Sequence, residues 1–332
     1  MKKLRKLLAI LTALAMFVSV LTVSMTSFAA TTKNVKQYKV YTAFGDSIPA
    51  GFSEPTYAGN SRDNLIQPLT RDSYVSWVGK YVGAETINCC ARLGERTHEF
   101  RHVLDPSYPT DVISQRYLPK KDVNGERVID EEACAKLRAG YIKLIKQSDL
   151  ITLNYGGNDS GQPLMYIKDL LTWNAGMAED ALDGETTLAE FIDIVKNSAD
   201  NSGKMLECVK CLLKAQNDFN ENFDYIVKFI HKVNPNATIV AVGLINPLSA
   251  LDIETPQGEI NIGHFLNIIN DANNRYMKSE SPYRDYYTFV NVQGVDTFMS
   301  EINTDEFMLD PHPTPSGHKE YARRIIAQLP TR

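Results

Sequence analysis

The sequence has 332 residues, with 35 Lys and Arg against 40 Asp and Glu and a formal net charge of −5. Hydrophobic residues at 43% and charged residues at 23% are ordinary for globular domains, which excludes a wholly disordered, collagen-like or coiled-coil chain. The mild acidic excess comes without the lysine and arginine stripe that neutralises phosphates, so no nucleic-acid partner is expected.

The first 29 residues have the three parts of a secretory signal peptide. Cationic residues fill four of the first six positions, an apolar run covers 7–23, and Ser27 and Ala29 supply the small residues of a cleavage site. The apolar run nearly reaches the length that begins to span a bilayer, which leaves an uncleaved anchor as the alternative. The sequence predicts a secreted protein that loses residues 1–29 and has no stable membrane insertion afterwards.

Five apolar runs that end in turn residues are predicted to be buried strands. In chain order they cover residues 39–44, 85–90, 149–155, 237–244 and 287–292. Helical patterns between and after them cover residues 134–145, 219–233, 265–277 and 316–329. Because strands alternate with helices, we expect crossover connections and a five-stranded parallel sheet with helices on both faces.

Two stretches interrupt this alternation. Residues 101–127 are rich in Pro, Asp, Tyr and Ser and are predicted to form a long surface loop, and residues 160–216 carry apolar side chains in helical spacing. Both follow strand ends, and ligands of open parallel sheets bind beyond the carboxyl ends of the strands. The sequence therefore predicts one domain over residues 36–330, with a helical insertion at about 160–216 that shapes a substrate cleft.

The chain has five cysteines: Cys89, Cys90, Cys134, Cys208 and Cys211. Export permits disulfides, but the odd count leaves at least one thiol unpaired or paired with another molecule, and no pairing is predicted. Cys208 and Cys211 have the spacing of half a zinc site without a second pair of matching spacing. They are expected to be thiols on a helix face, and no metal or other cofactor is predicted.

Groups suited to acyl transfer stand where three predicted strands end and where the last helix begins. Ser47 follows the first strand, Gly94 the second and Asn158 the third, and His312 precedes the helix. A serine hydroxyl becomes a good nucleophile when a histidine takes its proton, and the developing oxyanion needs donors aimed at it in advance. Ser47 and His312 are candidates for nucleophile and base. The backbone N–H groups of Ser47 and Gly94, with the Asn158 amide, are candidates for the oxyanion donors.

Four blocks in chain order carry a resemblance to a known family. They are Gly45-Asp46-Ser47-Ile48, the segment 88–97 around Gly94, Gly156-Gly157-Asn158-Asp159 and His312-Pro313-Thr314-Pro315-Ser316-Gly317-His318. These blocks resemble those of the SGNH, or GDSL, hydrolase superfamily, and the similarity extends over about residues 41–327. The resemblance implies a flavodoxin-like three-layer α/β/α sandwich, Ser47 as nucleophile, His312 as base, and Ser47, Gly94 and Asn158 as the oxyanion hole.

The acid that orients the histidine departs from the family pattern. It usually lies three residues before the histidine, where this sequence has Leu309. Asp310, two residues before His312, is the predicted acid, and the main-chain carbonyl of Leu309 and then Asp305 are the alternatives. The expected activity is hydrolysis of a small-molecule, glycan or lipid acyl ester by a secreted esterase or lipase, through an acyl-enzyme intermediate.

Two other functions compete with this prediction. His98-Glu99-Phe100-Arg101-His102 spells H-E-x-x-H, the pattern of a zinc metalloprotease helix. Pro106 stops that helix early and no third ligand follows, so a helix with histidines on its solvated face is the preferred interpretation. The other competitor is a non-catalytic cell-surface binding protein on the same fold.

Overall fold

The computed structural model describes residues 36–61, 63–111, 114, 119–121, 127–159, 202–247, 252–255, 258–261, 270–298 and 310–331. The predicted signal peptide, residues 1–29, and the first 42 residues of the predicted insertion, 160–201, lie outside them. In the described part of the chain, no helix has the length and apolar character needed to cross a membrane.

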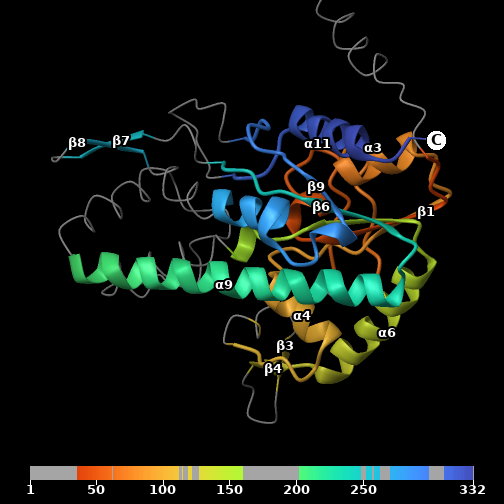
Figure 1. Ribbon diagram of the computed structural model, residues 1–332, viewed down its shortest axis with the longest axis horizontal. Helices are drawn as coiled ribbons and strands as arrows, with labels where there is room; N and C mark the ends of the chain where they lie inside the picture. The colour runs from red at the N-terminus through yellow and green to blue at the C-terminus, as the bar shows by residue number, and fades with distance from the viewer. Residues whose placement is uncertain are drawn as a thin grey trace, which may run out of the picture.

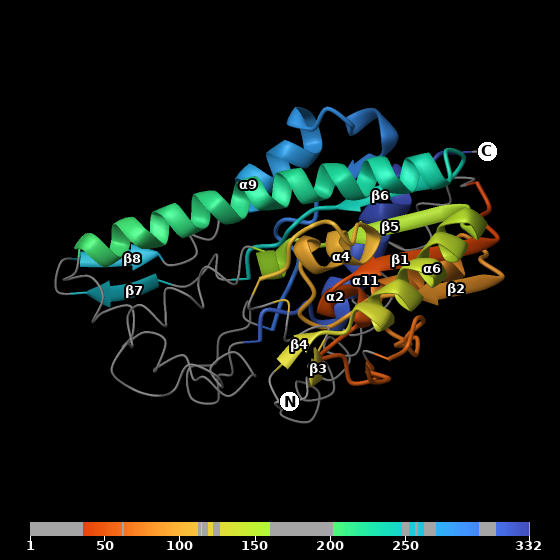
Figure 2. The same cartoon turned by 90° about the horizontal axis from the view of Figure 1, so that it is seen from below.

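A five-stranded parallel sheet forms the centre of the protein (Figure 1 and Figure 2). Its strands, in spatial order, are β2 (Thr86–Cys89), β1 (Val40–Gly45), β5 (Leu150–Asn154), β6 (Thr238–Val242) and β9 (Thr288–Val290). Every neighbouring pair is parallel. The prediction of five strands in one parallel sheet is therefore confirmed, with β9 shorter than its apolar run suggests.

Helices cover both faces of the sheet. Successive side chains of a strand point to opposite faces, so each strand contributes to a core on either side. Tyr41 and Ala43 of β1 pack into a core with α3 (Tyr74–Tyr81) and α11 (Pro315–Gln328). Phe44 points to the opposite face, where α4 (Thr97–Leu104), α6 (Glu131–Gln147) and α9 (Ser202–Val233) contribute the core. Figure 1 shows α3 and α11 above the sheet and the other three helices below it. The predicted three-layer sandwich is confirmed.

Local sequence signals set the starts of two of these helices. The Thr314 hydroxyl accepts a hydrogen bond from Gly317 N at 3.1 Å, and Pro315 occupies the first turn of α11, where its missing N–H costs nothing. The Asp130 carboxylate caps α6 by accepting from Ala133 N at 3.0 Å. Both helices thus begin where residues next to them in the sequence satisfy their first backbone N–H groups or need none.

The structure corrects the prediction at the loops. Residues 101–104 complete α4, and β3 (Pro119–Lys121) pairs antiparallel with β4 (Arg127–Ile129), so a single loop over 101–127 is wrong at both ends. The helix expected from residue 219 begins at Ser202, so residues 202–216 of the predicted insertion belong to it. Of the helix expected over 265–277, residues 270–275 are helical and continue into η1 (Tyr276–Glu280), while 265–269 lie outside the described residues. The short elements not predicted are α2 (Ser47–Ala50), β7 (Asp252–Thr255), β8 (Gly258–Asn261) and η2 (Arg284–Tyr286).

Helix α3 also escaped prediction, because its Tyr-Val-Ser-Trp-Val-Gly-Lys-Tyr sequence favours no helix on propensity. The helix is nevertheless stabilised by its Ser73 cap and by packing on α11. Cys89, Cys90 and Cys134 are buried free thiols. Cys208 and Cys211 lie in α9, and their side chains are outside the described part.

Candidate active site

Ser47 stands at the carboxyl end of β1, at the first position of α2. The turn depends on Gly45, whose φ is 153° and where an added Cβ would lie 2.4 Å from the carbonyl oxygen of Asn154. The Asp46 carboxylate then accepts a hydrogen bond from Ile48 N at 3.1 Å. A glycine and an aspartate thus bend the chain sharply enough to place the Ser47 side chain beyond the sheet.

His312 lies 265 positions later in the sequence and contacts the same serine. Its Nε2 is 2.8 Å from Ser47 Oγ, and its Nδ1 is 2.6 Å from Asp310 Oδ1. The same carboxylate oxygen accepts from the backbone N of His312 at 3.0 Å. Because an ionised carboxylate only accepts, Nδ1 carries the imidazole proton and Nε2 presents its lone pair to the serine hydroxyl.

The two-residue offset between Asp310 and His312 therefore lets one oxygen hold both the ring and the backbone of the histidine. Burial opposes ionisation of the Asp310 carboxyl, but hydrogen bonds from His312 and Ser53 outweigh it and hold its pKa below the usual value. The other two candidates for the acid, the Leu309 carbonyl and Asp305, lie outside the described residues.

Two residues at the histidine were missed by the sequence analysis. Ser53 Oγ lies 3.4 Å from His312 Nδ1, and the Phe52 ring meets the imidazole edge-on, with ring centroids 4.9 Å apart. Ser53 has a φ of 67°, a left-handed conformation that non-glycine residues adopt rarely. Phe52 keeps 38% of its surface exposed, so part of its ring faces solvent beside the imidazole. The only sequence signal was an aromatic residue in the turn behind the serine.

The predicted oxyanion donors gather at the same edge of the sheet. Gly94 lies in the turn that follows β2, with a φ of 72° that favours glycine. The Asn158 amide donates to Asp46 Oδ2 and to the carbonyl oxygen of Glu95, each at 3.2 Å. Asn158 therefore bridges the residue before Ser47 and the residue after Gly94, which links the three sequence blocks in space.

Three buried carboxyl groups lie behind this bridge: Asp46, Glu95 and Asp159. Burial raises the pKa of Asp46 to about 7, of Glu95 to about 8 and of Asp159 to about 6. The Tyr155 hydroxyl donates to Glu95 at 2.9 Å, and Thr97 donates to Asp159 from both its backbone N and its hydroxyl. Every one of these carboxyls thus has a donor, which fixes the backbone around Asn158.

The H-E-x-x-H segment lies on α4 but does not form a metalloprotease site. Glu99 is buried and accepts hydrogen bonds from Arg96 N and from Ser114 Oγ, each at 2.9 Å, in addition to its ion pair with Arg96. His98 packs edge-on against Tyr108. In the part of the chain that the structure describes, His98 shares no potential metal site with His102. The prediction that both histidines lie on the solvated face of the helix is wrong for His102, which is buried, whereas His98 is half-buried.

The solved structures similar to this chain include lipases and carbohydrate esterases. An extracellular lipase from Streptomyces rimosus is 16% identical, with a TM-score of 0.50 over 87% of this chain and 99% of that chain. Phospholipase A1 from Streptomyces albidoflavus NA297 is 14% identical, with a TM-score of 0.49 over 88% and 99%. A family two carbohydrate esterase from Clostridium thermocellum is 14% identical, with a TM-score of 0.37 over 88% of this chain and 63% of that chain.

None of the curated protein sequences compared with the chain matches it. The family model described as GDSL-like lipase/acylhydrolase matches residues 41–325, which is most of the chain. The parallel sheet with helices on both faces agrees with the fold of the Streptomyces rimosus lipase. The protein is therefore an ester-bond hydrolase that belongs to the GDSL-like lipase/acylhydrolase family.

Proposed function

We propose that the protein is a secreted serine esterase in which Ser47 is the nucleophile, His312 the general base and Asp310 the acid that orients it. The observation that carries this proposal is the chain of hydrogen bonds from Asp310 to His312 at 2.6 Å and from His312 to Ser47 at 2.8 Å. A serine hydroxyl is a weak nucleophile by itself, and such a chain is what activates it.

In the proposed reaction, Ser47 Oγ attacks the ester carbonyl carbon while His312 Nε2 takes the hydroxyl proton. The tetrahedral intermediate breaks its bond to the leaving alcohol, whose oxygen receives that proton from His312. Water then attacks the acyl-enzyme, giving one proton to His312, and the released acid leaves as Ser47 recovers its proton. The Asp310 carboxylate stabilises the imidazolium that forms in each half of the cycle.

The oxyanion of each tetrahedral intermediate is proposed to accept from Ser47 N, Gly94 N and the Asn158 amide. Both amide hydrogens of Asn158 have acceptors in the free protein, the Asp46 carboxylate and the Glu95 carbonyl. A charged oxyanion is a stronger acceptor than a neutral carbonyl, so it displaces Glu95. The bond to Asp46 keeps the side chain in place during this exchange.

Asn158→Ala is expected to lower kcat by about 10²- to 10³-fold and to change KM by only a few-fold, because the oxyanion exists only after attack. Steady-state kinetics with a soluble ester separate the two parameters. Asn234→Ala is the matched control, since the Asn234 amide also donates two hydrogen bonds, here to two backbone carbonyls at 2.8 Å each, but lies at the amino end of β6. A similar kcat loss in both variants contradicts the role of Asn158.

A fluorophosphonate probe tests the proposal directly, because it reacts only with an activated serine. We expect one covalent adduct per chain, on the proteolytic peptide that contains Ser47, and none after denaturation. Absence of the adduct from the folded protein contradicts the serine mechanism and favours the non-catalytic binding protein.

The substrate is proposed to be an acyl ester of a carbohydrate, a lipid or a small molecule. Support comes from the family, whose description names lipases and acylhydrolases. A panel of esters from acetyl to long acyl chains distinguishes the classes. A preference for acetyl groups favours an acetylated carbohydrate, and a preference for long chains favours a lipid.

Secretion is proposed from the tripartite pattern of residues 1–29. The protein produced in its own cells is expected in the culture medium, with Ala30 as its first residue, because the cleavage site precedes that position. N-terminal sequencing of the extracellular protein checks this. Recovery of a cell-bound chain that retains residues 1–29 contradicts cleavage and favours an anchor.

A further inference from the structure

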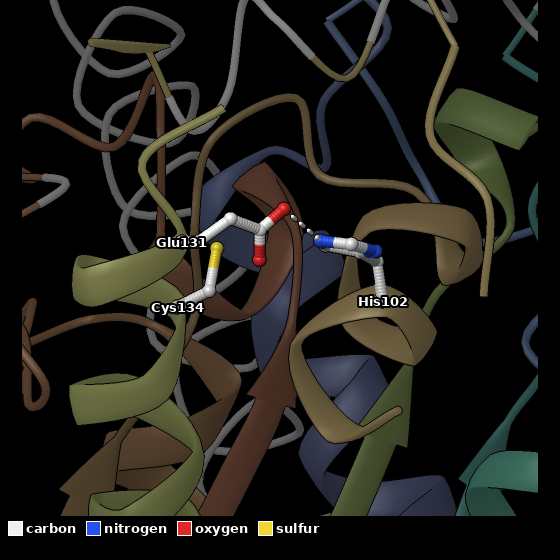
Figure 3. Close-up of side chains that lie close together, drawn as sticks. All are labelled: His102, Glu131 and Cys134. Atoms are coloured by element: carbon white, nitrogen blue, oxygen red, sulfur yellow. Dashed lines mark hydrogen bonds and ion pairs between the residues drawn. The ribbon is translucent and has the colours of Figure 1, made fainter. Parts of the chain in front are cut away.

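Three side chains of different chemistry gather between α4 and α6 (Figure 3). They take no part in the contacts of Ser47 and His312 described above. His102 comes from the last turn of α4, and Glu131 and Cys134 from the first turn of α6. One potential ligand atom from each lies within 4.8 Å of the others. Positions three apart on a helix share one face, so the carboxylate and the thiol both face the imidazole.

The hydrogen bonds of His102 fix which ring nitrogen carries the proton. Nδ1 lies 2.7 Å from the carbonyl oxygen of Tyr108, which can only accept, so Nδ1 is protonated. Nε2 of a neutral ring then presents a lone pair to Glu131 Oε1 at 3.2 Å, and an ionised carboxylate also only accepts. A positive species must lie between these two atoms, either a second proton or a metal ion. Metal-bound histidines commonly donate their other N–H to a backbone carbonyl in this way.

Cys134 distinguishes between the proton and the metal. A second proton on His102 would satisfy Glu131 without involving the Cys134 thiol, whose other contacts are those of packing in the core. Cys134 is only 3% exposed, and its Sγ lies within 4.8 Å of the potential ligand atoms of His102 and Glu131. A divalent cation supplies the charge that this position lacks and lets the thiolate form, with its proton released to solvent.

We propose that His102 Nε2, a Glu131 carboxylate oxygen and Cys134 Sγ bind a zinc ion, with water as the fourth ligand. Imidazole, thiolate and carboxylate are the ligands that Zn²⁺ prefers, and one thiolate with one carboxylate neutralises its charge. Tetrahedral zinc places its donor atoms about 3.4–3.6 Å apart. The His102–Glu131 pair is already at 3.2 Å, and the Glu131 side chain is 62% exposed and free to adjust.

Bound zinc would tie the end of α4 to the start of α6 and so close the chain between residues 104 and 131 into a loop. Its expected effect is on the stability of this face of the sandwich. The H-E-x-x-H pattern then contributes one ligand, His102, to a site completed by residues that lie 29 and 32 positions further along the chain.

Cobalt substitution tests the proposal. The chain that starts at Ala30, without an affinity tag, is freed of bound metal with a chelator and then titrated with Co²⁺. We expect one equivalent to produce a thiolate-to-cobalt charge-transfer band in the near ultraviolet, which Zn²⁺ then removes. Zn²⁺ is also expected to raise the melting temperature of the stripped protein, because it binds the folded state.

Variants assign the ligands. Cys134→Ser is expected to abolish the charge-transfer band, and Glu131→Gln to weaken Co²⁺ binding at least about 10-fold. Glu132→Gln is the matched control, because Glu132 is also an exposed carboxylate in the first turn of α6 but pairs with Lys136 at 2.7 Å. It should bind Co²⁺ like the wild type, as should the Cys208→Ser/Cys211→Ser double variant.

The proposal is overturned if the wild type gives no thiolate band, or if the band survives Cys134→Ser and disappears in the Cys208→Ser/Cys211→Ser variant. Equal Co²⁺ affinity of Glu131→Gln and Glu132→Gln also overturns it. That last comparison holds even if Cys134→Ser does not fold, because both glutamates are surface residues.

Discussion

Ser47→Ala is expected to lower kcat for ester hydrolysis by about 10⁴- to 10⁶-fold, the range found when a triad nucleophile is removed. In the proposed mechanism the variant has no atom that can attack the ester or receive the acyl group, so the rate expected to remain comes from the oxyanion donors and substrate binding alone. The fold should persist, because the change removes one hydroxyl and its hydrogen bond to His312. Initial rates, together with urea unfolding, measure both effects.

Ser53→Ala is the matched control for this prediction. The Ser53 hydroxyl contacts the same imidazole, but at Nδ1 and at 3.4 Å, the side that faces Asp310. Its removal is expected to cost at most about 100-fold in kcat, since the Ser53 hydroxyl also donates to the Asp310 carboxylate and a hydrogen bond to a charged group contributes about 1.5–3 kcal/mol. Comparable losses in the two variants, or a larger loss at Ser53, contradict Ser47 as the nucleophile.

Asp310→Asn is expected to lower kcat by about 10³- to 10⁴-fold while leaving the protein folded. The amide NH₂ of the new side chain donates to Nδ1, which moves the imidazole proton to Nε2, and Nε2 can then no longer accept the proton of Ser47. The expected signature is a large fall in kcat and in the rate of fluorophosphonate labelling, with little change in KM.

Asp305→Asn completes this experiment, because it separates the three candidates for the acid. A near-normal rate for Asp305→Asn beside a large loss for Asp310→Asn supports Asp310. The reverse result assigns the acid to Asp305. Small losses in both variants favour the Leu309 carbonyl.

Properties that depend on neighbours in the sequence were predictable. The five strands of the sheet appear as short apolar runs because both faces of a parallel sheet are buried, and their alternation with helices leads to the observed layers. The start of α11 follows from Thr314 and Pro315, whose effects are local. The four motif blocks named Ser47, Gly94, Asn158 and His312, and they indicated the family that the comparison then established.

Contacts between distant residues were decided only by the tertiary structure. The sequence did not show whether an acid two residues before His312 could reach its ring, because that depends on how the loop before α11 folds against the Ser47 turn. The left-handed backbone of Ser53 and the meeting of His102 with Glu131 and Cys134 were equally hidden. Spacing in the sequence describes a single helix or turn, whereas these contacts join segments whose relative positions are set by packing of the whole core.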